Sequence, residues 1–167
     1  MNDLDVRQLL IAGGVPQDHL VGPSPSNDLG NYCSLFDPGG AEALGQRLAE
    51  AVRPHQPTLV VTWEDLDNSV LAYIVARELG VNALRVVDAS GVLDFDGAFG
   101  DADRAVLVSD AFRTDFAINA MRALTEQHGG HVVAFAALMS TPALSDATGD
   151  AAVTALWATP GDENPTS

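Results

Sequence analysis

The sequence of 167 residues contains no lysine and only one cysteine, Cys33. A lone cysteine cannot form an internal disulfide, and this usage is typical of a reducing compartment. No apolar run approaches the roughly 18 residues of a membrane span. Residues 1–5 also lack the basic segment that opens a signal peptide. These absences predict a cytoplasmic protein that does not enter a membrane.

Positive charge is scarce throughout the chain. Its 8 basic residues, all arginines, stand against 23 acidic ones, and the formal net charge at pH 7 is −15. A field of this sign repels nucleic acid and anionic membranes, so we expect neither as a partner. It also disfavours a polyanionic substrate unless a local basic patch overrides it. The simpler alternative is that the acidity serves solubility alone.

The first part of the chain predicts two helices. A short helical pattern covers residues 3–12 and stops at Gly13 and Gly14. A second covers residues 38–52 and ends before Pro54. Between the two helices, residues 16–27 are rich in proline, serine and asparagine and indicate a connection, and residues 31–36 are a candidate edge strand.

The rest of the chain alternates short apolar runs with helical patterns. The predicted strands cover residues 58–62, 83–87, 106–108 and 131–138, with a candidate edge strand at 151–157. The predicted helices cover residues 68–79 and 114–128. This alternation predicts an α/β fold, with a mainly parallel central sheet flanked by helices. The length suits a single domain over residues 1–159, followed by a disordered tail over 160–167.

Open parallel sheets bind ligands beyond the carboxyl ends of their strands. Three segments follow predicted strands and are therefore expected to form a site, namely residues 63–69, 88–100 and 109–116. The third belongs to the stretch VLVSDAFRTDFAINAM at residues 106–121, which is laid out as a strand, a turn and a helix. The start of a helix leaves backbone N–H groups unpaired and carries a partial positive charge, which favours an anion.

This stretch resembles the type I phosphoribosyltransferases, most closely those of the orotate kind. In that family an apolar strand is followed by two acids, two apolar residues and a turn rich in threonine and glycine that opens a helix. The resemblance implies that the acids hold the ribose hydroxyls of phosphoribosyl pyrophosphate (PRPP) and that the turn holds its 5′-phosphate. The residues at these positions are Ser109, Asp110, Ala111, Phe112, Arg113, Thr114, Asp115 and Phe116.

The resemblance extends over about residues 3–142. Tyr32 and the Phe36-Asp37-Pro38 run look like the family's first segment, and residues 58–80 look like its second unit. The loop of that unit grips pyrophosphate in the family, and its positions are held here by Trp63, Glu64 and Asp65. The resemblance also implies the type I phosphoribosyltransferase-like fold, a homodimer and, if the protein is active, Mg²⁺ as the cofactor.

The chain departs from the family at its chemical positions. Ser109 stands where the first acid is expected, so Asp110 is the remaining carboxylate. Asp115 replaces a glycine, and Phe116 replaces a hydroxyl residue. We expect Asp115 to accept the free N–H groups of the helix itself, a contribution of about 0.5–2 kcal/mol. Its charge would also repel a phosphate by about 4 kcal/mol per unit pair at about 4 Å. This stretch is therefore interpreted as a former phosphate site that its own side chains fill.

Basic residues are missing where the family needs them. Arg113 could hold a phosphate in a fork, or it could be a solvated loop residue. Residues 86–104 correspond to the mobile, basic loop of the orotate enzymes but are short and acidic, with Arg85 and Arg104 at the borders. Because the chain has no lysine, no catalytic lysine can lie elsewhere. The loop at residues 63–67 carries three acids and no glycine, which would suit a hard cation or mere solvation.

Smaller features leave further alternatives. Asp67 is expected to cap the helix at residues 68–79, with Asn68 and Ser69 as competing candidates. Five aromatic residues are expected near the ligand face, where they would line a pocket for a flat, uncharged ligand or, as we favour, bury a dimer interface. These aromatic residues are Trp63, Phe95, Phe99, Phe112 and Phe116.

The sequence thus predicts a phosphoribosyltransferase-like protein of the orotate type with lost or much reduced transferase activity. It would act as a homodimeric binding or regulatory protein, with a nucleoside-like or protein ligand. We assign no catalytic residue and no metal ligand. One alternative is an active phosphoribosyltransferase of nucleotide metabolism that uses PRPP and Mg²⁺. Another is an acidic module that binds a protein partner.

Overall fold

The computed structural model describes residues 3–13, 15, 17–20, 37–100, 102–146 and 151–158. The strands are β1 (Leu59–Trp63), β2 (Asn82–Ala89), β3 (Val92–Phe95), β4 (Arg104–Ser109), β5 (His131–Met139) and β6 (Ala152–Trp157). The helices are α1 (Asp3–Ala12), α2 (Pro38–Val52), α3 (Leu66–Leu79), α4 (Asp115–Gln127) and α5 (Pro142–Asp146). Single 3₁₀ turns, η1 (Gln17–Leu20) and η2 (Arg53–His55), complete the elements.

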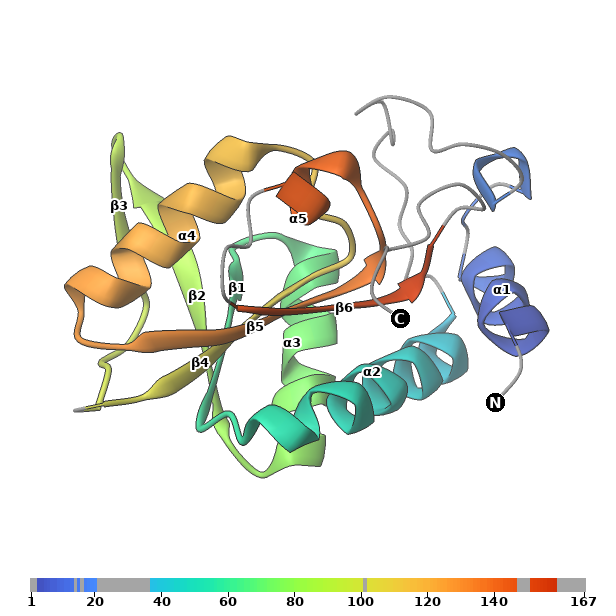
Figure 1. Ribbon diagram of the computed structural model, residues 1–167, viewed down its shortest axis with the longest axis horizontal. Coiled ribbons are helices and arrows are strands. Elements are labelled where there is room, and N and C mark those ends of the chain that lie inside the picture. The colour runs from blue at the N-terminus through green and yellow to red at the C-terminus, as the bar shows by residue number, and fades with distance from the viewer. Residues whose placement is uncertain are drawn as a thin grey trace.

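The six strands form one sheet in the order β3-β2-β1-β4-β5-β6 (Figure 1). Neighbouring strands run parallel from β2 to β6, and only β3 is antiparallel to its neighbour β2. The predicted mainly parallel sheet is therefore confirmed, and β6 lies at its edge as expected.

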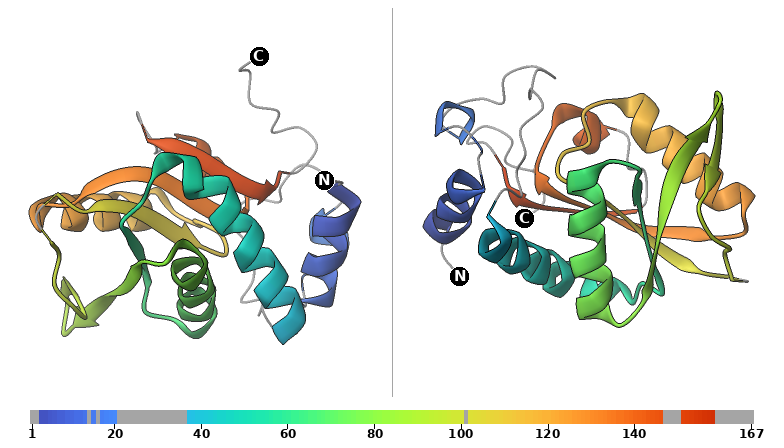
Figure 2. Two further views of the ribbon diagram at one scale, coloured as in Figure 1. Left: turned by 90° about the horizontal axis from the view of Figure 1, so that it is seen from below. Right: turned by 180° about the vertical axis from the view of Figure 1, so that it is seen from behind.

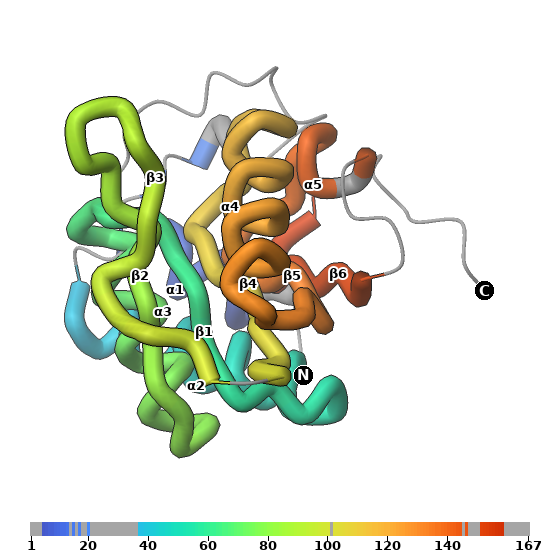
Figure 3. Tube along the Cα trace, turned by 90° about the vertical axis from the view of Figure 1, so that its left-hand side faces the viewer, coloured from blue at the N-terminus to red at the C-terminus, as the bar shows by residue number. Residues whose placement is uncertain are grey.

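Helices cover both faces of the sheet. Helices α2 and α3 lie against one face, and α4 and α5 lie against the other (Figures 1 and 2). The end view in Figure 3 shows the sheet between α3 and α4. Side chains alternate accordingly along β1, where Val60 enters the core under α2 and α3 while Leu59 and Val61 enter the core under α4. Central strands that are buried on both sides need apolar residues at every position, which explains the continuous apolar runs of the sequence.

Helices α2 and α3 approach each other closely. A Cβ atom on Gly45 of α2 would lie 2.5 Å from Cγ2 of Ile74 on α3. The apolar face of α2, formed by Ala41, Leu44, Leu48 and Val52, is fully or almost fully buried. The absence of a side chain at position 45 therefore allows α3 to lie this close to α2.

The prediction for residues 88–100 was wrong in one respect, because this segment is not a single loop. Strands β2 and β3 form a hairpin whose two-residue turn is Ser90-Gly91, with φ of 60° and 87°. Positive φ at both positions is the backbone of a type I′ turn, and glycine favours it. The Asp88 carboxylate also accepts the N–H of Gly91 at 2.6 Å. Strand β3 is too short to stand out in the sequence, but the Ser90-Gly91 turn indicates the hairpin.

Some predictions fall outside the described residues. These are the candidate strand at residues 31–36, the first-segment resemblance at Tyr32, most of the connection at 16–27 and the tail at 160–167. Among the helices that are described, none is both long and apolar enough to cross a membrane.

Candidate ligand site

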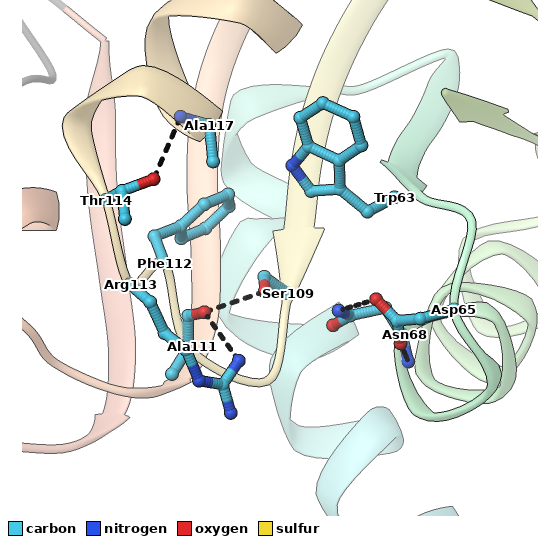
Figure 4. Close-up of a pocket in the computed structure, with 9 residues that line it drawn as sticks. All are labelled: Trp63, Asp65, Asn68, Ser109, Ala111, Phe112, Arg113, Thr114 and Ala117. Atoms are coloured by element: carbon cyan, nitrogen blue, oxygen red, sulfur yellow. Dashed lines mark hydrogen bonds between the residues drawn. The ribbon is translucent and has the colours of Figure 1, made fainter. Parts of the chain in front are cut away.

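Two strand-to-helix turns meet at the carboxyl edge of the sheet. Strands β1 and β4 are direct parallel neighbours, so their carboxyl ends lie side by side. We call residues 64–65, between β1 and α3, the α3 turn, and residues 110–114, between β4 and α4, the α4 turn. Figure 4 shows Trp63, Asp65 and Asn68 on one side of the site and Ser109 and the α4 turn on the other.

A pocket of about 210 Å³ lies between these turns. It is lined by Trp63, Asp65, Asn68, Ser109, Ala111, Phe112, Arg113, Thr114 and Ala117. Binding sites for small molecules usually have volumes of about 300–1,000 Å³. The pocket therefore suits a small ligand, or one part of a larger ligand.

The α3 turn is closed by a carboxylate. Asp65 caps α3 and accepts the backbone N–H of Asn68 at 2.8 Å and its side-chain amide at 2.6 Å. The predicted caps, Asp67 and its two alternatives, were wrong because α3 begins at Leu66, two residues before the predicted start. The amide oxygen of the buried Asn68 accepts the N–H of Asp110 at 2.7 Å and so joins the two turns.

The α4 turn is closed by an internal ion pair. The Arg113 guanidinium donates to both carboxylate oxygens of Asp110, at 3.1 and 2.8 Å. The Ala111 N–H donates to the same carboxylate at 2.6 Å. The Asp110 side chain is only 9% exposed and that of Arg113 is 33% exposed. The alternative of a merely solvated Arg113 was therefore wrong, because the guanidinium is paired within its own loop.

Arg113 remains firmly charged. Its hydrogen bonds to Asp110 raise the pKa of the guanidinium, and partial burial lowers it by less. The negative charges of Asp110, Asp65 and Asp67 raise it further. The only cation that lines the pocket thus sits in an acidic surrounding that already balances its charge.

The N-terminus of α4 is capped by Thr114. Thr114 has an extended backbone, and its Oγ1 accepts the N–H of Ala117 at 3.2 Å. Asp115 was expected to accept these N–H groups, but it is the first helical residue and its side chain is exposed. A residue inside the helix points away from the amides that a cap can reach. The Asp115 charge still lies at the positive end of the helix.

The remaining predicted site residues separate into buried and exposed groups. Ser109 is 3% exposed, and its hydroxyl lies 3.3 Å from an Asp110 carboxylate oxygen and 3.1 Å from the Ala111 carbonyl. Phe116 is 75% exposed and does not line the pocket. Glu64 is exposed as well and lies outside the pocket lining.

The five aromatic residues do not form one cluster. Phe112 is buried at the pocket, edge-on to Phe135. Phe95 and Phe99 pack instead around His128, with centroid distances to its ring of 5.2 and 5.8 Å. His128 is the C-terminal cap of α4, so this group lies at the opposite end of the helix from the pocket. The expectation of a common aromatic surface was therefore wrong.

Trp63 leaves one polar atom without a partner. Its indole lies across the pocket from Phe112 in Figure 4, and its Nε1 is buried with no hydrogen-bond partner. A buried donor without an acceptor costs about 1–3 kcal/mol. A ligand or water that offers an acceptor to this N–H would relieve that cost.

The donor set does not fit a metal centre. Within the described part of the chain, no three His, Cys, Asp or Glu side chains are grouped so that they could hold a metal ion. The Asp65 carboxylate binds Asn68, and the Asp110 carboxylate binds Arg113. The acids of residues 63–67, one option for a hard cation, are therefore not arranged as a metal site.

The backbone is similar to solved phosphoribosyltransferases. Adenine phosphoribosyltransferase from Rhodothermus marinus aligns with a TM-score of 0.69 and 19% identity over 93% of this chain and 99% of that chain. Orotate phosphoribosyltransferase from Mycobacterium tuberculosis, solved with inorganic phosphate, aligns with a TM-score of 0.70 and 14% identity over 93% of this chain and 87% of that chain. UMP synthase from Leishmania donovani aligns with a TM-score of 0.69 and 13% identity over 95% of this chain and 36% of that chain.

Similarity is detected in the structure and not in the sequence. No protein-family model and no curated protein matches the sequence. At identities of 13–19% the likeness establishes the fold and not the chemistry. The chain has the type I phosphoribosyltransferase fold, as predicted.

Proposed function

We propose that this protein binds a small ligand at the carboxyl edge of a phosphoribosyltransferase fold without transferring a phosphoribosyl group. It would act as a binding or regulatory protein. The observation that carries this proposal is the ion pair between Asp110 and Arg113. Within the α4 turn, a carboxylate of the chain takes the two-pronged contact that Arg113 would otherwise offer to a phosphate.

The electrostatics of the pocket support the same conclusion. Asp65 lines it, Asp110 is paired with the pocket-lining Arg113, and Asp115 is exposed at the start of α4. A phosphate at about 4 Å from any of these carboxylates is repelled by about 4 kcal/mol per unit pair in an effective dielectric near 20. Transfer of a ribosyl group also builds negative charge on the leaving pyrophosphate, which placed cations normally stabilise. The Arg113 charge is already balanced here.

The pocket favours an uncharged ligand that accepts hydrogen bonds. Trp63 offers an unpaired indole N–H across the pocket from the ring of Phe112, and the volume of about 210 Å³ limits the size of the ligand. A flat, nucleoside-like ligand could place a ring and a carbonyl oxygen against these groups. Such a ligand avoids the repulsion that a phosphate would meet.

An active transferase is the second candidate, and the similarity over almost the whole length of an adenine phosphoribosyltransferase favours it. In this alternative Asp110 and Ser109 would hold ribose, Arg113 and Thr114 would hold phosphate, and Mg²⁺ would accompany PRPP. The ion pair would then have to open on each binding event. Because the donor set does not fit a metal centre, we assign no step to Mg²⁺.

Calorimetric titration with PRPP and Mg²⁺ at moderate salt tests the proposal. We expect no heat of binding up to millimolar ligand. Binding at micromolar concentration would overturn the proposal and favour the transferase. The substitution Asp110→Asn tests the cause, because it keeps the shape of the side chain and removes the charge that holds Arg113. We expect at least about tenfold tighter binding of inorganic phosphate.

A matched control separates the local cause from the change in net charge. Asp96 forms an ion pair with Arg85 at a distance of 2.7 Å, and neither residue lines the pocket. Asp96→Asn therefore removes one negative charge outside the pocket. We expect Asp96→Asn to leave phosphate affinity unchanged. Equal gains in both variants, or none in Asp110→Asn, would refute the role of the ion pair. Asp115→Gly combined with Phe116→Thr restores family-like residues at α4 and should strengthen phosphate binding further.

A further inference from the structure

A pocket of about 400 Å³ lies between helix α1 and the 3₁₀ turn η1, and we call it the α1 pocket. Its volume is within the range of sites that hold small organic molecules. Helix α1 lies beside α2 and the edge strand β6 (Figures 1 and 2), and the α1 pocket shares no lining residue with the pocket between the α3 and α4 turns. The α1 pocket is lined by Arg7, Gln8, Ile11, Ala12 and Gln17.

The amino-acid pattern of α1 explains how this pocket forms. Val6 and Leu10 are buried in the core, and the four pocket-lining residues of α1 follow them by one or two positions. These four residues therefore lie along the flank of the helix, in two rows of i, i+4 spacing. After the helix, Val15 and Leu20 are buried in the same core cluster, and the Val15 N–H donates to the Leu10 carbonyl at 2.9 Å. The chain thus turns back at the end of α1, and Gln17 lines the pocket from the side of η1.

Arg7 is the one arginine that has no partner within the described part of the chain. Its half-buried guanidinium makes no hydrogen bond, ion pair or ring contact there, and its Nε is buried without an acceptor. Every other arginine is engaged by a carboxylate, a backbone carbonyl or an aromatic ring. These are Arg47, Arg77, Arg85 and Arg113 with carboxylates, Arg53 and Arg104 with carbonyls, and Arg122 with the ring of Phe135. A buried donor without an acceptor costs free energy, and a ligand that supplies the acceptor relieves that cost.

The lining of the α1 pocket favours a single carboxylate that carries an aliphatic chain. The planar guanidinium of Arg7 matches the two oxygens of a carboxylate, and Gln8 and Gln17 add amide donors. Ile11 and Ala12 supply apolar surface, and no acidic residue or aromatic ring is among the described lining residues. The net charge of −15 repels a polyanion more strongly than an anion with one charge.

We propose that the α1 pocket binds a small aliphatic monocarboxylate, with the carboxylate on the Arg7 guanidinium and the chain against Ile11 and Ala12. This site is additional to the one proposed above and does not depend on it, because the two pockets share no residue. Helix α1 is joined to α2 by the ion pair of Asp5 with Arg47 at 2.6 Å. A ligand that binds the folded α1 pocket therefore stabilises the folded protein through linkage.

Heteronuclear NMR titration of the isotopically labelled full chain with hexanoate, at fixed ionic strength, tests the proposal. We expect saturable shifts at the backbone amides of the lining residues and a rise in the melting temperature. Acetate lacks most of the aliphatic chain and hexanol lacks the charge, so each should bind at least about tenfold more weakly than hexanoate. The absence of saturable shifts at these amides up to tens of millimolar hexanoate, or equal binding of hexanol, would overturn the proposal.

Three variants identify the groups that bind hexanoate. Arg7→Met keeps an apolar side chain of similar length and removes the guanidinium, and it should weaken binding by about tenfold or more. Arg85→Met removes the same charge outside the α1 pocket and should leave the affinity unchanged. Gln8→Glu guards against a folding defect in Arg7→Met, because it is an isosteric change at an exposed position that brings a negative charge to the pocket. It should weaken hexanoate binding while far-ultraviolet circular dichroism stays unchanged. Equal losses in Arg7→Met and Arg85→Met, or full affinity in both pocket variants, would refute the site.

Discussion

The α3 turn and the α4 turn leave neighbouring parallel strands at the same edge of the sheet, yet they close their helices differently. In the α3 turn a carboxylate, Asp65, accepts the backbone N–H of Asn68 directly. In the α4 turn the carboxylate of Asp110 pairs with Arg113, and the neutral hydroxyl of Thr114 caps the helix. A carboxylate cap brings a negative charge to the N–H groups of the helix start, whereas a hydroxyl cap brings none. At α4 the Asp115 charge lies near that end but does not cap it.

The difference shows that an approaching anion would meet different groups at the two helix starts. At α3 the helix start is occupied by the chain itself, and no cation lies in the turn. At α4 the helix start has a neutral cap, and the cation Arg113 is present but engaged. We therefore infer that phosphate binding can be recovered at α4 by releasing one residue, and that α3 would need its cap removed.

Breaking the link between the turns should have the largest effect. Asn68→Ala removes the amide that binds Asp65 and leaves the N–H of Asp110 buried without its acceptor. We expect a loss of about 2–4 kcal/mol in the free energy of unfolding, measured by urea denaturation. Asn119→Ala, at an exposed position of α4, is the control and should cost less than about 0.5 kcal/mol. Similar values for both variants would show that the turns are not coupled through Asn68.

Removing the cation should affect the α4 turn nearly as strongly. Arg113→Met leaves the largely buried Asp110 carboxylate without its cationic partner, and we expect a loss of about 1–3 kcal/mol. Arg85→Met breaks the more exposed pair with Asp96, in which the Arg85 side chain is 45% exposed, and should cost below about 1 kcal/mol. Equal losses in urea denaturation would contradict the distinct role of the inner pair.

The sequence predicts the elements around these turns well because burial dictates them. Val60, Val61 and their neighbours on β1 are apolar at successive positions since both faces of the strand are covered. The helix caps are harder to predict, because a shift of the start of α3 by two residues moves the cap from Asp67 to Asp65. The β2–β3 hairpin was missed because β3 has only four residues, one of them acidic, although Ser90-Gly91 is a turn signal.

The chemistry of the site depends on contacts that a local pattern does not contain. Asn68 and Asp110 are 42 positions apart, and only the parallel pairing of β1 with β4 brings them together. The pair of Asp110 and Arg113 spans three positions and was within reach of local reasoning. Its geometry depends on the backbone of an irregular turn, which no periodicity specifies. The expectation that Asp115 accepts the first N–H groups of α4 was wrong, because Thr114 caps that helix.

The two caps themselves can be compared by removal. Asp65→Ala and Thr114→Ala should each destabilise the protein by about 0.5–2 kcal/mol, with the larger loss at Asp65 because its carboxylate also binds the Asn68 side chain. Thermal or urea unfolding measures the difference. Ser69→Ala, inside the first turn of α3, is the control for a change that removes no cap. A larger loss at Thr114 would mean that the hydroxyl cap is the more important of the two.

Making the turns alike should have the smallest effect on stability and a clear effect on binding. Thr114→Asp gives α4 a carboxylate cap like that of α3, and we expect a gain of only about 0.3 kcal/mol. Thr114→Asn offers a neutral cap of similar rank and separates geometry from charge. In the Asp110→Asn background, where phosphate binding is expected to appear, the added Thr114→Asp change should abolish it and Thr114→Asn should not. If both changes leave phosphate affinity equal, the helix start of α4 plays no part in binding, and Arg113 alone accounts for the recovered site.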